Sequence, residues 1–208
     1  GEHSRWLFPL SLVVLTALAW LKRWVQDDAY ISFRYAEHLA QGHGLVWNIG
    51  ERVEGYTNFL WTVLVAGGMT LGIDPVALTL FLGLCLYVVA LIFTYRSARL
   101  LLSNSLWAYV VMVLVGLFPT FQIFATSGLE TMLQATLLVV GIYLLVVSRM
   151  ENHWSTGRLL SISLVMAAAF LTRMDSALWI SVLMLFAIYH VAVHSQQKLI
   201  SLAVLTLP

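Results

Sequence analysis

Charged side chains are scarce in this chain of 208 residues: Asp, Glu, Lys and Arg together make up 10% of it, whereas soluble domains carry about 25%. Hydrophobic residues make up 61% of the chain, and the mean hydropathy is +0.88. This composition excludes an ordinary soluble domain and predicts an integral membrane protein. The formal net charge of +1 gives no sign of nucleic-acid binding, and no nucleic-acid partner is expected.

Cysteine is nearly absent as well. The single Cys85 lies in an apolar run, so no intramolecular disulfide can form and no cysteine-based metal site is expected. The six histidines show no ligand spacing, because His190 and His194, although four residues apart, have no acidic partner nearby. No metal ligand is therefore assigned from these two residue types.

Apolar runs fill most of the chain. About 20 residues at a rise of 1.5 Å cross a hydrocarbon core of about 30 Å, so these runs are candidate membrane helices. They are Leu7–Trp24, Phe59–Ile73, Val76–Tyr95, Leu106–Phe118, Met132–Val147, Leu159–Thr172 and Ala177–Val193, and an eighth begins near Leu199. Because runs this long are not barrel strands, the predicted fold class is an all-α polytopic membrane protein. The chain ends inside the eighth run, and we expect it to be the N-terminal part of a longer protein.

Residues 25–58 form the longest polar stretch. Its segment from Asp28 to Gln41 predicts a helix at the membrane surface, with Asp27 or Asp28 capping the start and Gly42 and Gly44 ending it. One face would carry Ile31, Tyr35 and Leu39, which is the pattern of an interfacial amphipathic helix. Aromatic residues suited to the headgroup level follow: Trp47, Tyr56 and Trp61.

Basic residues favour the cytoplasmic side of a membrane. This rule places inside Arg5, Arg96, Arg99, Arg149, Arg158 and Lys198. With this assignment the helix parity fails, and one resolution is that Phe59–Ile73, at about 22 Å, does not fully cross. On this interpretation Asp74, Ser127–Glu130 and Arg173–Asp175 join the 25–58 loop outside. The alternative is that every run crosses and the charge rule fails for several short loops.

The adjacent carboxylates of Asp27 and Asp28 favour a general base or a metal site, and a helix cap is the simpler, compatible alternative. Glu54 is a second candidate acid or ligand, or a solvated loop residue. Glu130 in the first turn of a helix is explained by the helix dipole alone. Arg173 and Asp175 end a membrane run, where ionisable residues are costly and usually functional, or they form an interfacial ion pair.

Cations on the outer side would suit a substrate that carries a phosphate. They are Lys22, Arg23, Arg34, Arg52 and Arg173. Snorkelling to lipid headgroups explains Lys22 and Arg23 equally well.

Three stretches of the loop resemble the first external loop of GT-C glycosyltransferases, which take a sugar from a polyprenyl-phosphate donor. They are the acidic run Asp27–Leu39, then Gly-His-Gly-Leu-Val-Trp-Asn at 42–48, and Val-Glu-Gly-Tyr-Thr-Asn-Phe-Leu-Trp at 53–61. The later Ser-Gly-Leu-Glu-Thr at 127–131 and Leu-Thr-Arg-Met-Asp at 171–175 also look like family signatures, although many relatives have Pro where Met174 stands. The resemblance spans roughly residues 7 to 180. It is nearest to the bacterial arabinofuranosyltransferase branch, ahead of the protein O-mannosyltransferases and the aminoarabinose transferases of lipid A.

The resemblance implies a GT-C transmembrane module: a first membrane helix at 7–24, an external catalytic loop at 25–58 that contains an interfacial helix, and further membrane helices at 59–208. Asp27 matches the catalytic base and Asp28 its acidic neighbour. The implied donor and phosphate contacts are Arg34, Glu54, Tyr56, Asn58, Glu130, Arg173 and Asp175. Some relatives follow the loop acid with Lys, but Gly55 stands there, so Arg173 or Arg34 would hold the phosphate.

The implied function is transfer of one sugar, with arabinofuranose or mannose as candidates, from polyprenyl-phosphate to an external glycan, lipid or protein. The expected location is the bacterial inner membrane, with the active site on the external face. No cofactor is certain, and a divalent metal ion is one option. The rival functions are a lipid or solute transporter, although no repeated halves with broken helices are visible, and a structural membrane subunit.

Overall fold

The computed structural model describes residues 3–51 and 53–194 of the chain. Over these residues the fold is all α-helical, with a single 3-10 turn and no strand, which confirms the predicted all-α class. The helices are α1 (His3–Leu21), α2 (Ala29–Ala40), α3 (Phe59–Thr70), α4 (Pro75–Leu101), α5 (Ser105–Leu117), α6 (Pro119–Phe124), α7 (Thr131–Met150), α8 (Thr156–Thr172), η1 (Met174–Ser176) and α9 (Ala177–His194). The predicted eighth run near Leu199 and the cations Arg52 and Lys198 lie outside the described residues.

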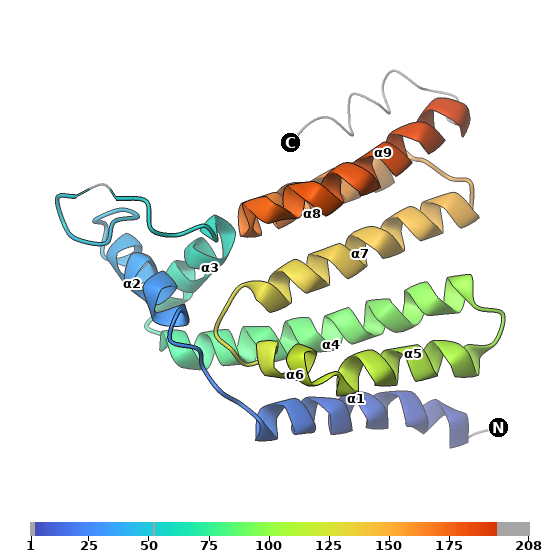
Figure 1. Ribbon diagram of the computed structural model, residues 1–208, viewed down its shortest axis with the longest axis horizontal. Helices are drawn as coiled ribbons and strands as arrows, with labels where there is room; N and C mark the ends of the chain where they lie inside the picture. The colour runs from blue at the N-terminus through green and yellow to red at the C-terminus, as the bar shows by residue number, and fades with distance from the viewer. Residues whose placement is uncertain (1–2, 52, 195–208) are drawn as a thin grey trace.

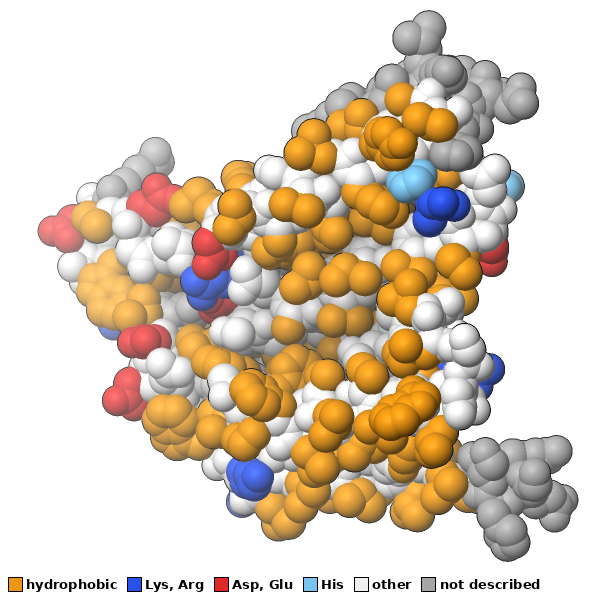
Figure 2. Space-filling view, turned by 45° about the vertical axis from the view of Figure 1, so that its right-hand side comes forward, with side chains coloured by type: hydrophobic (Ala, Val, Ile, Leu, Met, Phe, Trp, Pro, Cys, Tyr) orange, Lys and Arg blue, Asp and Glu red, His pale blue; other side chains and the backbone are white. Residues whose placement is uncertain are grey.

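Helices α1, α4, α5, α7, α8 and α9 lie side by side in the body of the molecule (Figure 1). Within the described residues, three segments are long and apolar enough to cross a membrane by length and composition: Pro75–Leu101, Thr131–Met150 and Met174–Val193. Four shorter apolar helices accompany them: Trp6–Leu21, Phe59–Thr70, Ser105–Leu117 and Thr156–Thr172. Hydrophobic side chains also cover much of the surface of this body (Figure 2). These are the properties of an integral membrane protein.

Helix α3 lies outside the body formed by these helices and packs against α2 at one end of that body (Figure 1). Its 12 residues span about 18 Å, well short of a hydrocarbon core of about 30 Å. This arrangement is the one expected if the 59–73 run does not cross. As a result the 25–58 loop, the turn before α4, the α6–α7 turn and the α8–η1 junction all lie at the same end of the molecule (Figure 1).

The charged side chains are also distributed unequally between the two ends of the molecule. Acidic side chains gather along the edge formed by this end (Figure 2). Among the residues that the structure describes, the exposed Glu151 lies at the opposite end beside Arg158. We therefore call the end that carries α2, α3 and residues 127–130 and 173–176 the acidic end.

The α2 helix begins and ends where the sequence predicts, with Asp28 before it and Gln41 after it. The predicted apolar face is confirmed only in part, because Tyr35 is 1% exposed and Leu39 packs against the core shared with α3, whereas Ile31 is 40% exposed. The face that packs on α3 carries Ala29, Ser32, Phe33 and Ala36, at helical spacings of three and four. Protein covers this face of α2, whereas Tyr30 and Ile31 lie on its exposed side.

The prediction that Trp61 lies at the headgroup level is wrong. Trp61 is 1% exposed and lies in the hydrophobic core shared by α2, α3 and α7, so it is not a headgroup anchor. The indole N–H of Trp61 donates a hydrogen bond to the carbonyl oxygen of Gly128 at 3.0 Å. A buried indole needs such a partner, and the bond fixes α3 against the α6–α7 turn.

Candidate functional site

Two motifs that are far apart in the sequence are joined by the backbone at the acidic end. The N–H of Gln26, next to Asp27, donates to the carbonyl oxygen of Ser127 at 2.9 Å, and the N–H of Trp24 reaches Thr126 Oγ1 at 3.4 Å. The segment that leads into α2 is thereby held against the turn that leads into α7. The sequence-predicted acidic pair and the Ser-Gly-Leu-Glu turn are therefore neighbours.

Gly128 makes this close approach possible. Its φ is +81°, a conformation that residues with a Cβ rarely adopt. A Cβ added at this position would lie 2.9 Å from Ala29 Cβ and 3.2 Å from Val25 Cγ1. The turn at 127–130 therefore requires glycine both for its backbone conformation and for its packing against α2.

Glu130 is the buried centre of the site. Its side chain is 6% exposed and its two carboxylate oxygens accept separate hydrogen bonds. Oε1 accepts from Arg173 Nη1 at 2.8 Å, and Oε2 accepts from Asn58 Nδ2 at 2.8 Å. The helix dipole alone does not account for a carboxylate with two side-chain donors, so the purely local explanation of Glu130 is insufficient.

Asn58 connects this carboxylate to the α2–α3 pair. Its Nδ2 also donates to Ser32 Oγ at 2.8 Å, and its Oδ1 accepts from Thr62 Oγ1 at 3.0 Å. Asn58, Ser32 and Thr62 are all buried. Every one of these polar groups is thus satisfied inside the protein, as buried polar groups must be to avoid a desolvation penalty.

Arg173 joins the two acids of the α7–α9 side. Its Nη2 donates to Asp175 Oδ2 at 2.8 Å, and its Nε lies 3.1 and 3.2 Å from the two Asp175 oxygens. Hydrogen bonding to Asp175 raises the pKa of the Arg173 guanidinium, against partial desolvation, and Glu130 adds to the rise. Gln134 Nε2 donates to both Asp175 Oδ1 at 3.1 Å and Ser176 Oγ at 2.9 Å.

Three residues of this network were not predicted from the sequence: Ser32, Thr62 and Gln134. Gln134 lies four residues after Glu130, a spacing that puts both on one helix face, in an otherwise apolar run. Gln134 could therefore have been identified from the sequence as a candidate site residue. Ser32 and Thr62 carry no comparable signal, because hydroxyl residues occur in many membrane helices without any functional role.

Asp27 and Asp28 are both exposed. Asp28 occupies the N-cap position of α2, but its side chain makes no cap hydrogen bond and instead accepts from Gln26 Nε2 at 3.3 Å. Within the described chain, the Asp27 carboxylate has neither a hydrogen bond nor an ion pair. The side-chain cap interpretation was therefore wrong, and the Asp27 carboxylate is left open to the solvent.

Arg34 is engaged elsewhere. Its Nε donates to the carbonyl oxygen of Trp47 at 2.9 Å, and its guanidinium lies 5.0 Å from the centre of the Trp47 ring. It therefore ties α2 to the following loop, whereas Arg173 joins the Glu130 network.

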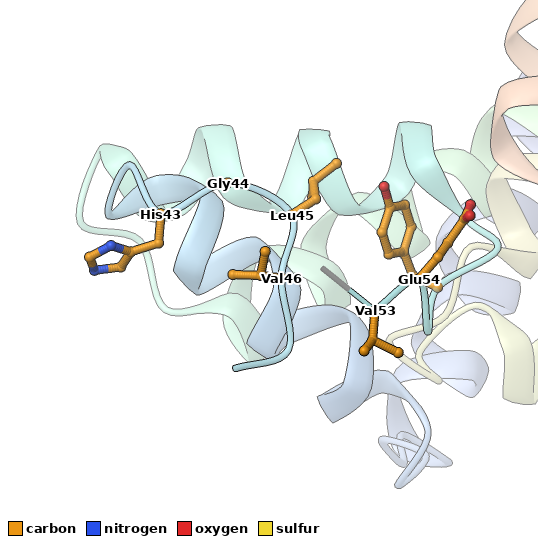
Figure 3. Close-up of a pocket in the computed structure, with 7 residues that line it drawn as sticks. His43, Gly44, Leu45, Val46, Val53 and Glu54 are labelled. Atoms are coloured by element: carbon orange, nitrogen blue, oxygen red, sulfur yellow. The ribbon is translucent and has the colours of Figure 1, made fainter. Parts of the chain in front are cut away.

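Glu54 and Tyr56 lie between two pockets. One, of about 240 Å³, is lined by Glu54, Tyr56, Thr57, Phe59, Phe170, Leu171 and Met174. The other, of about 470 Å³, is lined by His43, Gly44, Leu45, Val46, Val53, Glu54 and Tyr56 (Figure 3). We call them the membrane-side pocket and the loop pocket. Burial raises the pKa of the Tyr56 phenol, and the neighbouring Glu54 carboxylate and Tyr35 add to the rise.

The described residues contain no group of three or more His, Cys, Asp or Glu side chains that could hold a metal ion. The acidic end instead offers an open carboxylate at Asp27, a guanidinium held in a fixed orientation at Arg173, and an apolar pocket next to it. Such a set can remove a proton, bind an anion and receive a hydrocarbon chain.

Comparison with known proteins finds two relevant relatives. The chain is 34% identical to a terminal β-(1→2)-arabinofuranosyltransferase of Mycobacterium tuberculosis over 62% of this chain, and it covers 22% of that protein. It is 30% identical to a terminal β-(1→2)-arabinofuranosyltransferase of Corynebacterium glutamicum over 49% of this chain, and it covers 12% of that protein. The chain thus spans a minor part of both relatives. No family model matches the chain, and no solved structure does.

Proposed function

We propose that the chain is the N-terminal part of a membrane glycosyltransferase of the GT-C type. It moves a single sugar from a polyprenyl-phosphate donor to a hydroxyl of an external glycan, lipid or protein. Arabinofuranose is the first candidate sugar and mannose the second, because both relatives carry the name arabinofuranosyltransferase. The proposed location is the bacterial inner membrane, with the acidic end and its 25–58 catalytic loop on the external face.

One observation carries this proposal. The backbone bond from Gln26 to Ser127 and the side-chain network around Glu130 bring together motifs from the loop, from α7 and from the α8–η1 junction. Hydrophobic packing of membrane helices does not need ionisable residues at such a junction, and their burial is costly unless every group is paired. Their concentration at one end favours a reaction at the membrane surface.

Asp27 is the proposed general base. It takes the proton of the acceptor hydroxyl while the acceptor oxygen bonds to the anomeric carbon of the donor sugar. The bond from that carbon to the phosphate oxygen breaks in the same in-line displacement, and the lipid phosphate leaves with the bonding electrons. Asp28 is the acidic neighbour of this base in the chain, and its carboxylate accepts a hydrogen bond from Gln26. The open carboxylate of Asp27 suits this role, because no internal partner has to be displaced before it accepts the proton.

Arg173 is the proposed contact for the leaving phosphate. A guanidinium has five N–H groups, and the described chain uses three of them, for Glu130 and Asp175. Two N–H groups remain on a side chain that is 36% exposed. Glu130, Asp175 and Asn58 are then positioning residues, which hold Arg173 so that little side-chain entropy is lost when the phosphate binds.

The membrane-side pocket is the proposed place for the first units of the prenyl chain. Its apolar wall is formed by Phe59, Phe170, Leu171 and Met174, and Met174 directly follows Arg173 in the chain. Glu54 and Tyr56 form its polar edge and are proposed to contact the donor sugar. A lipid chain held here would bring its phosphate to the guanidinium.

The test is transfer of label from polyprenyl-phosphate sugars by membranes that contain the full-length parent. Asp27→Asn is expected to reduce transfer at least about a hundredfold, the contribution typical of general base catalysis, without changing the amount of protein in the membrane. Glu37→Gln is the matched control, because Glu37 is an exposed carboxylate on α2 whose one partner is Gln41. Full transfer by Asp27→Asn would reject Asp27 as the base. Absence of transfer from every donor by the wild-type protein, with lipid binding retained, would favour the transporter alternative.

A further inference from the structure

A third pocket, of about 330 Å³, lies at the end of the molecule opposite the acidic end. Its lining includes Thr94, Ser97 and Leu101 of α4, Val111 of α5, and Val139 and Ile142 of α7. The α4 residues recur at spacings of three and four, so they share one helix face. Helix α4 packs against both α5 and α7 and lies between them (Figure 1). The pocket is therefore a groove with α4 as its floor, and we call it the α4 groove.

The lining of the α4 groove suits a hydrocarbon chain. Apart from the hydroxyl groups of Thr94 and Ser97, the lining side chains are apolar, and apolar cavities hold water poorly. A volume of about 330 Å³ corresponds to a cube about 7 Å wide, whereas a helix with its side chains is about 10–12 Å across. A single acyl chain therefore fits the groove, and a further membrane helix does not enter it.

Ser97 adds an unsatisfied polar group to this lining. It is 8% exposed, and its Oγ is buried without a hydrogen-bond partner in the described chain. Hydroxyl groups elsewhere in the helices, such as those of Ser148 and Ser161, donate to the carbonyl oxygen four residues earlier. An unpaired hydroxyl in an apolar region is costly. After rotation about the Cα–Cβ bond of Ser97, a ligand oxygen in the groove would accept this hydrogen bond.

The charge at this end favours a ligand with an anionic group. The described guanidinium groups here include those of Arg96, Arg99, Arg149 and Arg158, and the described acid Glu151 is already paired with Arg158. Arg149 is exposed and has neither a hydrogen bond nor an ion pair with the described residues.

The position of Arg149 places this cation at the mouth of the α4 groove. Arg149 follows Ile142 by seven residues, two helical turns, and so lies on the face of α7 that lines the groove. Ser97 lies about 6 Å before Leu101, the last residue of α4. A phosphate at the helix ends and an ester carbonyl one turn deeper would match these two side chains.

We propose that the α4 groove binds an anionic phospholipid. One acyl chain occupies the groove, an ester carbonyl oxygen accepts from Ser97 Oγ, and the phosphate meets the Arg149 guanidinium. Basic pockets between membrane helices are suited to such headgroups. The groove lies at the opposite end from Arg173, so it is separate from the proposed donor site and does not depend on the transfer reaction. Helices α4 and α7 both run from the groove to the acidic end (Figure 1), so the bound lipid stabilises the pair that supports Glu130.

The test is binding of phosphatidylglycerol and phosphatidylcholine, with identical acyl chains, to the full-length parent in a non-ionic detergent, measured by native mass spectrometry. Wild type is expected to bind phosphatidylglycerol more tightly. Arg149→Gln should weaken that binding about fivefold, the effect of one cation near a membrane surface. Ser97→Ala should weaken both lipids about fivefold, the loss of one neutral hydrogen bond. Arg158→Gln is the control, because that guanidinium is paired with Glu151.

Equal binding of phosphatidylglycerol by wild type and Arg149→Gln would overturn the inference, and this is the result expected if another part of the parent covers the groove. Equal binding of the two lipids by wild type would also overturn it. A loss for Arg149→Gln without any loss for Ser97→Ala would reject a glycerolipid as the ligand. A second measurement is thermal unfolding with and without phosphatidylglycerol. The lipid should raise the Tm of Ser97→Ala less than that of wild type, and equal increases would contradict the proposed contact.

Discussion

Replacing Glu130 by Gln tests whether the buried network holds the acidic end together. The glutamine amide has nearly the same shape, but it offers one oxygen where the carboxylate offers two. Arg173 Nη1 and Asn58 Nδ2, each 2.8 Å away, both need an acceptor, so one of them would face an NH₂ group instead. One charge-assisted hydrogen bond is then lost, worth about 1.5–3 kcal/mol, and the other becomes a weaker neutral bond.

The expected loss of stability is about 2–4 kcal/mol. The upper end of the range for buried ion pairs does not apply, because Arg173 is 36% exposed and keeps Asp175. The matched control is Glu151→Gln, which breaks the Arg158–Glu151 pair at the opposite end. The side chains of that pair are 28% and 56% exposed, so its loss is expected to change stability by less than about 1 kcal/mol.

The assay is equilibrium unfolding of the full-length parent in mixed micelles of a mild detergent and dodecyl sulfate, followed by helical circular dichroism. A larger loss for Glu130→Gln than for Glu151→Gln supports the network as a structural clamp. If the two variants lose the same stability, Glu130 is not buried and doubly bonded as described, and the positioning role assigned to it fails with that geometry.

Two further predictions concern the same end of the molecule. Gly128→Ala is expected to destabilise by about 2–5 kcal/mol, since strain at positive φ adds to overpacking against Ala29. Gly72→Ala, with a φ of +77° and open space around the added Cβ, should show the strain alone, at about 1–2 kcal/mol. Equal losses would rule out the close contact. Because the pKa of Tyr56 is raised, its contribution to stability is complete below pH 10 and is lost as the pH rises through the folded-state value. Tyr56→Phe should therefore lose less stability than wild type above pH 10, and identical alkaline profiles would contradict this.

Helix positions followed closely from the sequence. The run Val76–Tyr95 became α4, Pro75–Leu101, because helical structure continues through polar residues such as Arg96 once the apolar run has started it. The start of α4 is set by a signal visible in the sequence, since Asp74 accepts a hydrogen bond from the N–H of Ala77 at 2.8 Å and Pro75 follows it. The short α6 went unnoticed, because six residues carry too little periodicity.

The orientation of α2 was predicted only in part, since Tyr35 and Leu39 of the predicted face pack inside the protein and Ile31 does not. Counting apolar residues selected Ile31, Tyr35 and Leu39, which treats the surroundings of the helix as lipid on one side and water on the other. The real partner is α3, and small residues such as Ala29 and Ala36 allow it to approach. Hydropathy alone does not predict that an alanine is buried where an isoleucine is exposed. Predicting the buried face of α2 would have required knowing that α3 packs against it.

For the site, the sequence predicted candidate charged residues and offered the Arg173–Asp175 ion pair, which the structure contains, but it did not predict the pairing of Arg173 with Glu130. Arg34 and Arg173 were equal candidates for a phosphate contact. The structure distinguishes them, because Arg34 is bound to the Trp47 loop and Arg173 to Glu130 and Asp175. Bonds such as Asn58 to Ser32 join separate helices, and no local pattern encodes such a pairing.

The polar groups of the acidic end fall into two sets with different consequences for function. In one set, which includes Asn58, Glu130 and Asp175, internal donors or acceptors occupy the side chains, so these residues fix geometry. In the other set, Asp27, His43 and Glu54, the described chain provides no hydrogen bond to the side chain. Open groups on a rigid support lose little entropy when a ligand binds and need no internal bond to break first. Substitutions in the first set should therefore affect stability together with activity, whereas those in the second should affect kinetic constants alone. That difference makes the second set the more direct route to identifying the reaction.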